Sequence, residues 1–185
     1  MDTQQFADEI NRSIQYTIQA HAHHPKQPED AVRYWDHFTP YAVHPIWCAM
    51  TLLTETALPD DVRRTGYQAL LWHDLLEDTG LPLPAETSPA VRQLVEEMTF
   101  AGFSEEKEKL WERSDLARLL KLYDKVSNLL DGSWMSGGKK WQDYVAHTLR
   151  LVDFVSARYG ALNIVKIARV IAVPLPGTGE SEKPA

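Results

Sequence analysis

The sequence contains a single cysteine, Cys48, in 185 residues. One cysteine excludes an internal disulfide framework, and because Cys48 lies in an apolar stretch we expect a buried structural thiol. Long hydrophobic runs are also absent: no stretch of about 18 apolar residues occurs, which argues against a membrane span. The opening residues Met-Asp-Thr-Gln-Gln are neither basic nor apolar and do not resemble a secretory signal. We therefore expect a cytoplasmic protein.

Positive charge is scarce as well. The chain carries 19 lysines and arginines against 26 aspartates and glutamates, which gives a formal net charge of −7. This balance argues against a nucleic acid or an anionic membrane as partner, although local basic residues can still hold a small anionic substrate. The length fits one domain, which we place at 1–173. The tail 174–185 is rich in Pro, Gly, Ser and Glu, and it should be disordered.

Apolar residues recur at helical spacing through most of the chain, which predicts an all-α fold of about seven to eight helices. The segment 161–173 is rich in Ile and Val, but its polar residues recur every three positions and favour a helix over a strand. A cluster of His21, His23 and His24 ends the first helix, and we expect it to be solvated. The further helices are predicted at 41–56, at 60–78, from Pro89 after the N-cap Ser88, from Asp115 after Ser114, and at 139–159.

Two segments are expected to interrupt this pattern. The stretch 102–113 carries many charges of both signs and is predicted to be a solvated helix face or a mobile cover near the site. The segment 134–138 contains two glycines and is predicted to be a hinge-like break.

The stretch 67–80 is where we expect the chemistry. It is an apolar helical run that presents His73, Asp74, Glu77 and Asp78 within its last turn before Gly80. Carboxylates at the C-terminal end of a helix oppose its dipole, so three of them together indicate a compensating cation, most simply a metal ion. The alternative is a helix end that frays into solvent.

Two other positions supply metal-binding side chains, each as a lone polar group on an apolar helix. His44 opens one such helix, and Asp124 interrupts another. Burying an unpaired carboxylate costs several kcal/mol, so Asp124 needs a cationic partner. That partner is either the same metal ion or one of the neighbouring lysines, Lys121 and Lys125.

The order of His44, His73-Asp74 and Asp124 along the chain resembles the signature of the HD-domain metal-dependent phosphohydrolases. In detail the sequence is similar to the RelA/SpoT hydrolase branch, including its small stand-alone members, over about 7–154. The acidic pair Glu77-Asp78 is the most specific part of this similarity, because many HD enzymes lack it. The matching segments are 39–45, 69–79, 91–99 and 120–129.

The resemblance implies an HD-domain helical bundle with one Mn²⁺ ion held by His44, His73, Asp74 and Asp124. Two imidazoles and two carboxylates suit such an ion with open positions better than a closed structural Zn²⁺ site. The ion would polarise a phosphoryl oxygen and activate water. We expect Glu77 and Asp78 to orient and deprotonate that water.

The resemblance also implies residues that hold the substrate. In the family a basic loop after the first helix grips the substrate, and its position falls on Lys26 here. Pro25 stands where the family is usually basic, and Arg33 is available for the missing role. Asn128 and Tyr144 are expected to contact the nucleoside; the alternatives are that Asn128 caps a backbone group and that Tyr144 only packs as an aromatic.

The favoured function is metal-dependent removal of the 3′-pyrophosphate from guanosine tetra- or pentaphosphate alarmones. Because the basic loop departs from the family pattern, an HD phosphohydrolase acting on another nucleotide or deoxynucleotide is a second hypothesis. A third is a non-catalytic all-α module that binds a nucleotide and uses the metal structurally. All three take a small-molecule nucleotide as ligand.

Overall fold

The structure, a computed structural model, describes residues 3–33, 36–130 and 138–172. No β-strand occurs within these ranges, where only isolated bridges join Pro25 to Thr79 and Val32 to Pro40. The prediction of an all-α fold is confirmed. The elements are α1 (Thr3–His23), the 3₁₀ helix η1 (Pro28–Ala31), α2 (Val43–Leu53), α3 (Asp60–Trp72), α4 (Leu75–Asp78), α5 (Pro89–Met98), α6 (Phe103–Lys109), the 3₁₀ helix η2 (Leu110–Glu112), α7 (Asp115–Leu130), α8 (Gly138–Tyr159) and α9 (Asn163–Ile171).

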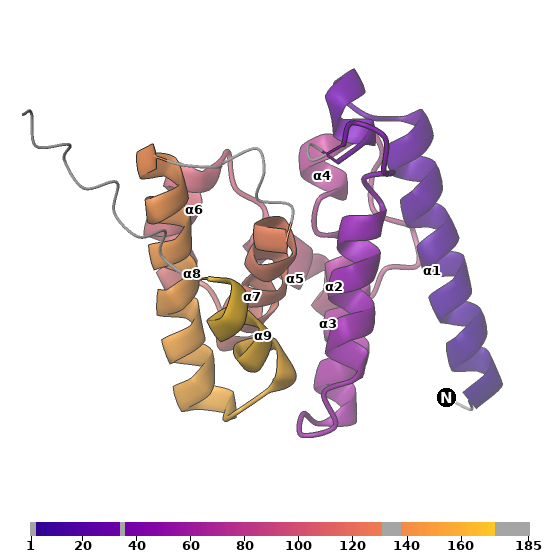
Figure 1. The fold of residues 1–185 in the computed structure, drawn as a ribbon. Coiled ribbons are helices and arrows are strands. Elements are labelled where there is room, and N and C mark those ends of the chain that lie inside the picture. The colour runs from indigo at the N-terminus through magenta and orange to yellow at the C-terminus, as the bar shows by residue number, and fades with distance from the viewer. Residues whose placement is uncertain (1–2, 34–35, 131–137, 173–185) are drawn as a thin grey trace, which may run out of the picture.

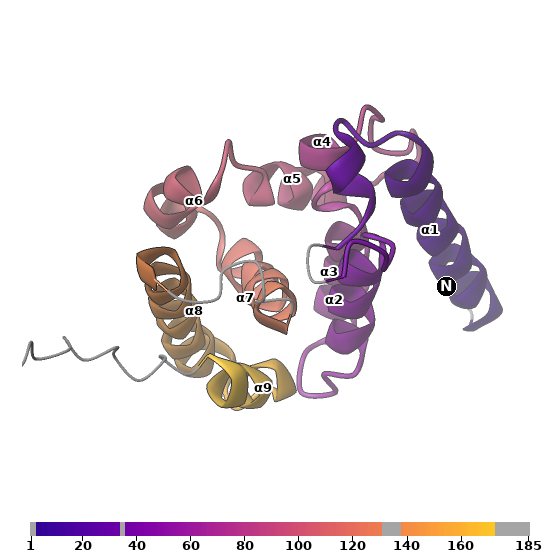
Figure 2. The same cartoon turned by 45° about the horizontal axis from the view of Figure 1, so that its top comes forward.

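Helix α7 lies in the middle of the bundle. It packs against α2, α3, α5, α8 and α9, and Figure 2 shows these helices arranged around it. Helix α1 lies on the outside against α3 (Figure 1). Most of α7 is buried, and its buried residues include Lys121, Asp124 and Lys125 as well as leucines. The central helix therefore carries both core and charged side chains.

A glycine allows α3 to approach its neighbours closely. A Cβ atom at Gly66 would lie 2.6 Å from Leu52 Cδ2 on α2 and 3.0 Å from Leu120 Cδ2 on α7. A side chain at this position would require these leucine side chains to shift.

Two helix starts agree with the sequence prediction. Ser88 Oγ accepts a hydrogen bond from the Val91 amide at the start of α5, and Ser114 Oγ accepts one from the Ala117 amide at the start of α7. Each serine thereby satisfies an amide that lacks a partner within the helix. The segment 161–173 contains helix α9, as predicted.

The predicted continuous helix over 60–78 is wrong. Helix α3 ends at Trp72, a turn follows at His73 and Asp74, and α4 begins at Leu75. The carbonyls of Leu70 and Leu71 bond instead to His73 Nδ1 at 2.7 Å and to the Thr17 hydroxyl at 3.1 Å. In an unbroken helix these carbonyls accept from the amides of residues 74 and 75, so both side-chain bonds compete with continuation of the helix.

Two predictions concern residues outside the described ranges, and a third concerns membrane-spanning helices. The hinge at 134–138 lies outside the described residues except for Gly138, which begins α8. The tail 174–185 lies outside them entirely. Among the helices that the structure does describe, none has the length and apolarity needed to cross a membrane.

Candidate metal centre and substrate cavity

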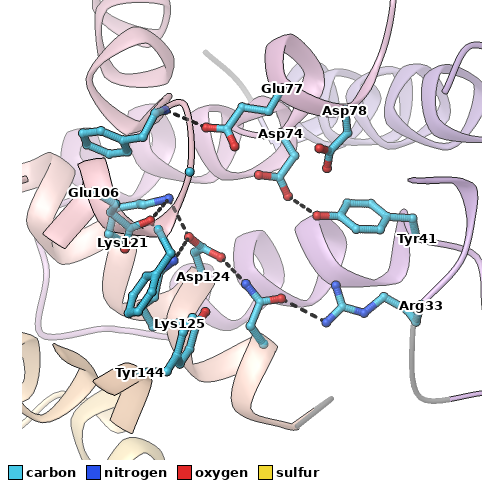
Figure 3. Close-up of a pocket in the computed structure, with 14 residues that line it drawn as sticks. Arg33, Tyr41, Asp74, Glu77, Asp78, Glu106, Lys121, Asp124, Lys125 and Tyr144 are labelled. Carbon is cyan, nitrogen blue, oxygen red and sulfur yellow. Dashed lines mark hydrogen bonds and ion pairs between the residues drawn. The ribbon is translucent and has the colours of Figure 1, made fainter. Parts of the chain in front are cut away.

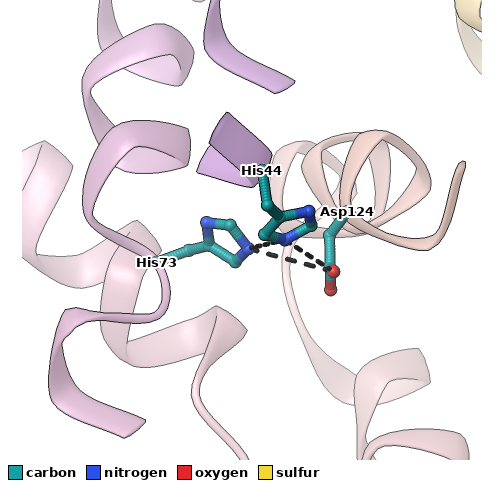
Figure 4. Close-up of side chains that lie close together, drawn as sticks. All are labelled: His44, His73 and Asp124. Carbon is teal, nitrogen blue, oxygen red and sulfur yellow. Dashed lines mark hydrogen bonds and ion pairs between the residues drawn. The ribbon is translucent and has the colours of Figure 1, made fainter. Parts of the chain in front are cut away.

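Three buried side chains from separate elements meet beside α7. His44 lies in the first turn of α2, His73 follows α3, and Asp124 lies on α7 (Figure 4). The Nε2 atoms of the two histidines are 3.2 Å apart, and Asp124 Oδ1 lies 3.5 Å from His44 Nε2 and 3.9 Å from His73 Nε2. One ligand atom from each residue lies within 4.8 Å of the others, close enough to hold one metal ion.

The outer nitrogens of both rings are held by neighbours. His73 Nδ1 donates to the Leu70 carbonyl, and His44 Nδ1 lies 2.8 Å from the Ser127 hydroxyl. A carbonyl oxygen only accepts, so a neutral His73 presents the lone pair of Nε2 to the centre. Hydrogen bonds of this kind orient histidine ligands in metal proteins. The rings are therefore fixed with their Nε2 atoms facing inward.

Asp74 lies close to the same two ring nitrogens. Its Oδ1 is 3.1 Å from His73 Nε2, and its Oδ2 is 3.3 Å from His44 Nε2 and accepts a 2.8 Å hydrogen bond from the Tyr41 hydroxyl. All four residues predicted as metal ligands are thus gathered within one cluster. The role of Asp74 as a ligand stays a prediction.

The electrostatics of this cluster favour a cation. Burial disfavours a charged ring, but Asp74 and Asp124 raise the pKa of His73 to about 9. Burial opposes ionisation of Asp74 too, yet the neighbouring His73 and His44 hold the pKa of this carboxyl below its usual value. The raised pKa of His73 shows that the surrounding carboxylates stabilise a positive charge at this place. Two imidazole nitrogens and carboxylate oxygens therefore fit a divalent ion.

Glu77 and Asp78 lie on the short helix α4 next to this cluster. Glu77 Oε1 accepts a 2.8 Å hydrogen bond from the Phe100 amide. Burial, together with the charge of Asp74, raises the pKa of Glu77 and raises that of Asp78 to about 8. Both carboxylates are held in a confined space beside the predicted ligands.

One cavity unites most of the predicted site residues. It is lined by seven of them: Arg33, Asp74, Glu77, Asp78, Asp124, Asn128 and Tyr144. Figure 3 labels all of these except Asn128 and shows their side chains around the cavity. The sequence analysis did not assign the other lining residues to the substrate site: Tyr41, Phe100, Gly102, Phe103, Glu106, Lys121 and Lys125.

Asn128 links a predicted substrate residue to a predicted metal ligand. Arg33 Nη2 donates to Asn128 Oδ1 at 3.1 Å, and Asn128 Nδ2 donates to Asp124 Oδ1 at 2.7 Å. The side chain therefore bridges two charged groups instead of capping a backbone group. Tyr144 is buried and lines the cavity, with its ring 4.9 Å from that of Phe103.

Lys26 lies apart from this cavity. Its Nζ donates to the Leu76 carbonyl at 2.7 Å, and its exposed side chain lines a neighbouring depression together with Glu77 and Asp78. The structure thus brings Arg33, but not Lys26, into the main cavity.

The expectation that 102–113 forms a solvated face or mobile cover is wrong for Glu106. This residue of α6 is 4% exposed and contacts Lys121, Lys125 and His147 at 2.9, 2.7 and 3.1 Å. Burial disfavours its charged form, but the two ammonium groups lower the pKa of Glu106 to about 2. The sequence held no signal for this role, because Glu106 is one of several acidic residues in a charged stretch.

The predicted solvated histidine cluster is only partly correct. His23 and His24 are exposed, but His21 is buried and its ring lies 4.8 Å from that of Tyr41. Burial lowers the pKa of His21 to about 4. The sequence predicted a solvated His21 because a polar loop follows it, whereas the ring of Tyr41 packs against His21 in the buried interior.

Fold and site together define an all-α helical bundle whose histidine and aspartate cluster fits a metal site. No protein-family model and no curated protein matches the sequence. Among solved structures, a metazoan ortholog of SpoT that hydrolyzes ppGpp and plays a role in starvation responses has this fold, with a TM-score of 0.62. It is 24% identical, and the match covers 88% of this chain and 92% of that one. The predicted fold is confirmed.

Proposed function

We propose that this protein is a metal-dependent phosphohydrolase that acts on a nucleotide. The observation that supports the proposal most is the convergence of His44, His73 and Asp124, because Asp124 also lines a cavity that holds cationic side chains. A site that combines inward-facing imidazole nitrogens with arginine and lysine suits a phosphorylated ligand. The rival reading, a binding module with a structural metal, gives Glu77 and Asp78 no chemical task.

His44, His73, Asp74 and Asp124 would hold the divalent ion, which we propose is Mn²⁺. When bound, such an ion polarises a phosphoryl oxygen and lowers the pKa of water. In the proposed reaction, Glu77 and Asp78 orient the attacking water, and one of these two carboxylates accepts its proton. Glu77 is suited to this role because the Phe100 amide fixes one carboxylate oxygen.

The substrate that we favour is a guanosine tetra- or pentaphosphate carrying a 3′-pyrophosphate. The support is the shared fold with a protein that hydrolyzes ppGpp, together with the placement of Arg33 in the cavity. Water would attack the phosphorus next to the ribose, the 3′-oxygen–phosphorus bond would break, and pyrophosphate would leave intact. Asn128 and Tyr144 would contact the nucleoside.

The charge of the cavity favours a second candidate, a nucleotide with fewer phosphates. The described residues that line the cavity include five carboxylates and three cationic groups. One divalent ion would bring the formal charge of this lining to zero and leave no excess positive charge. A bis-pyrophosphorylated nucleotide brings two concentrations of negative charge that need further cations. Lys26 lies outside this cavity and does not supply one there.

A nucleotide panel with added Mn²⁺ tests the proposal. We expect hydrolysis that stops after chelation, with pyrophosphate and guanosine 5′-phosphates as products from guanosine 3′-pyrophosphates when resolved by ion exchange. Release of phosphate from 5′-nucleotides or deoxynucleotides, with the 3′-pyrophosphates left intact, would favour the second candidate. Binding of a nucleotide without turnover of any panel member would reject the enzyme and favour the binding module.

A further inference from the structure

We infer that Lys121 and Lys125 form a two-lysine phosphate clamp that contacts the phosphoryl group undergoing attack. This inference rests on the proposed function and adds a subsite to it. Both lysines lie on α7, on either side of Asp124 in the sequence, and both line the cavity. Neither is a surface lysine, since they are 4% and 5% exposed.

The two oxygens of Asp124 face opposite neighbours. Oδ1 faces the histidine pair, whereas Oδ2 lies 2.7 Å from Lys121 Nζ and 3.3 Å from Lys125 Nζ. Because one carboxylate joins both sets, the two ammonium groups lie next to the group that connects them to the histidine pair. A phosphoryl group held near the histidine pair could therefore also meet the ammonium groups. Figure 3 shows both lysines converging on Asp124 from the same side of the cavity.

Glu106 keeps the two like charges together. Its Oε2 contacts both ammonium groups, at 2.9 Å for Lys121 and 2.7 Å for Lys125, and its Oε1 lies 3.1 Å from His147 Nε2. Two lysines on one turn of a helix repel each other, and burial increases that cost. The buried carboxylate offsets this repulsion. The lysines are therefore held in a fixed pair before any substrate arrives.

Each ammonium group has a donor left for a ligand. An ammonium carries three N–H groups, and Glu106 and Asp124 account for two on each lysine. Lys121 lies 5.5 Å from the ring centroid of Phe100, and Lys125 lies 5.0 Å from that of Tyr144. A phosphoryl oxygen would accept from the remaining N–H group of each lysine.

The test compares Lys121→Met and Lys125→Met with the wild-type protein in the full chain. We expect each variant to bind inorganic phosphate at least about tenfold more weakly at saturating Mn²⁺, measured by calorimetry. With the hydrolysed nucleotide, kcat should fall roughly 100-fold, as for loss of a donor to the developing charge. The Mn²⁺ dissociation constant should stay the same or decrease, because removing a cation near Asp124 favours a metal ion.

The control is Lys109→Met on α6, whose exposed side chain pairs with Glu105. It should match the wild type in all three measurements. Lys125→Arg keeps a cation and should retain more phosphate affinity than Lys125→Met. If the methionine variants unfold, the glutamine variants at both positions replace them in the same measurements.

Two results would overturn the clamp. One is phosphate affinity within twofold of the wild type in both variants at saturating Mn²⁺, combined with weaker Mn²⁺ binding, which assigns the lysines to positioning Asp124. The other is no phosphate binding by the wild-type, Mn²⁺-loaded protein. If the wild type binds phosphate but hydrolyses no nucleotide, the proposed function fails while the affinity comparison still decides the clamp.

Discussion

At the scale of single residues, the site depends on side chains whose two ends have different partners. Asp124 faces histidines with one oxygen and lysines with the other, and Asn128 connects it to Arg33. Paired charges of this kind fix each other's orientation, which lowers the cost of arranging a reactive site. The same pairing explains how an aspartate can be buried in the central helix.

Glu77→Gln tests the general-base role at this scale. The glutamine carbonyl can still accept from the Phe100 amide, so the local structure should survive. We expect Mn²⁺ and nucleotide binding to persist while kcat falls about 10²–10⁴-fold, because the amide cannot take a proton. Steady-state kinetics and calorimetry measure these quantities. The exposed Glu96→Gln on the neighbouring helix α5 is the control, and an unchanged kcat in Glu77→Gln would remove this residue from the mechanism.

At the scale of elements, a buried glutamate joins helices that are far apart in the sequence. Glu55, in the loop after α2, accepts from the amides of Asn163 and Ile164 at the start of α9, at 3.0 and 2.9 Å. It also accepts a 3.3 Å hydrogen bond from the Tyr123 hydroxyl on α7. A carboxylate suits the positive end of a helix, so Glu55 anchors α9 beside the central helix.

Glu55→Gln should destabilise the protein without touching the cavity. The glutamine side chain carries an NH₂ donor where glutamate has an acceptor oxygen, and this donor would face the amides at the start of a helix. We therefore expect a loss of about 2 kcal/mol in the free energy of unfolding. Urea denaturation measures this loss, with the exposed Glu108→Gln as a control that should stay within about 0.5 kcal/mol. A Glu55→Gln protein as stable as this control would show that the contact does not anchor α9.

At the scale of the whole molecule, the predicted metal centre connects three parts of the bundle. His44 comes from α2, His73 from the turn after α3, and Asp124 from α7, which is the central helix. An ion bound to all three would bind the folded chain and not the unfolded one. Metal binding should therefore stabilise the entire fold.

Removal of the ion should lower the melting temperature by roughly 5–10 °C relative to Mn²⁺ at about 100 times its dissociation constant. Calorimetry in the presence of Mn²⁺ or of a chelator measures the difference. His73→Ala and Asp124→Ala should lose most of this response, whereas the exposed His24→Ala should keep it. Full metal occupancy in both the His73→Ala and the Asp124→Ala proteins would refute the ligand assignment.

Helical periodicity and local capping determined much of this protein from its sequence alone. His44 and Asp124 were recognisable because each is a lone polar residue in an apolar helical stretch, and Ser88 and Ser114 because capping depends on residues close in sequence. The adjacent pair His73-Asp74 followed from its position at the end of such a stretch. These inferences needed only short-range spacing.

The tertiary structure alone decided how charges pair across elements. The break after Trp72 depends in part on Thr17 of α1, and the burial of Glu106 depends on α7 and α8 packing against α6. Whether Lys26 or Arg33 enters the cavity was likewise set by the path of the connection between α1 and α2. Hydrogen bonds and ion pairs between distant segments depend on which faces meet, and the spacing of residues along one segment carries no information about that.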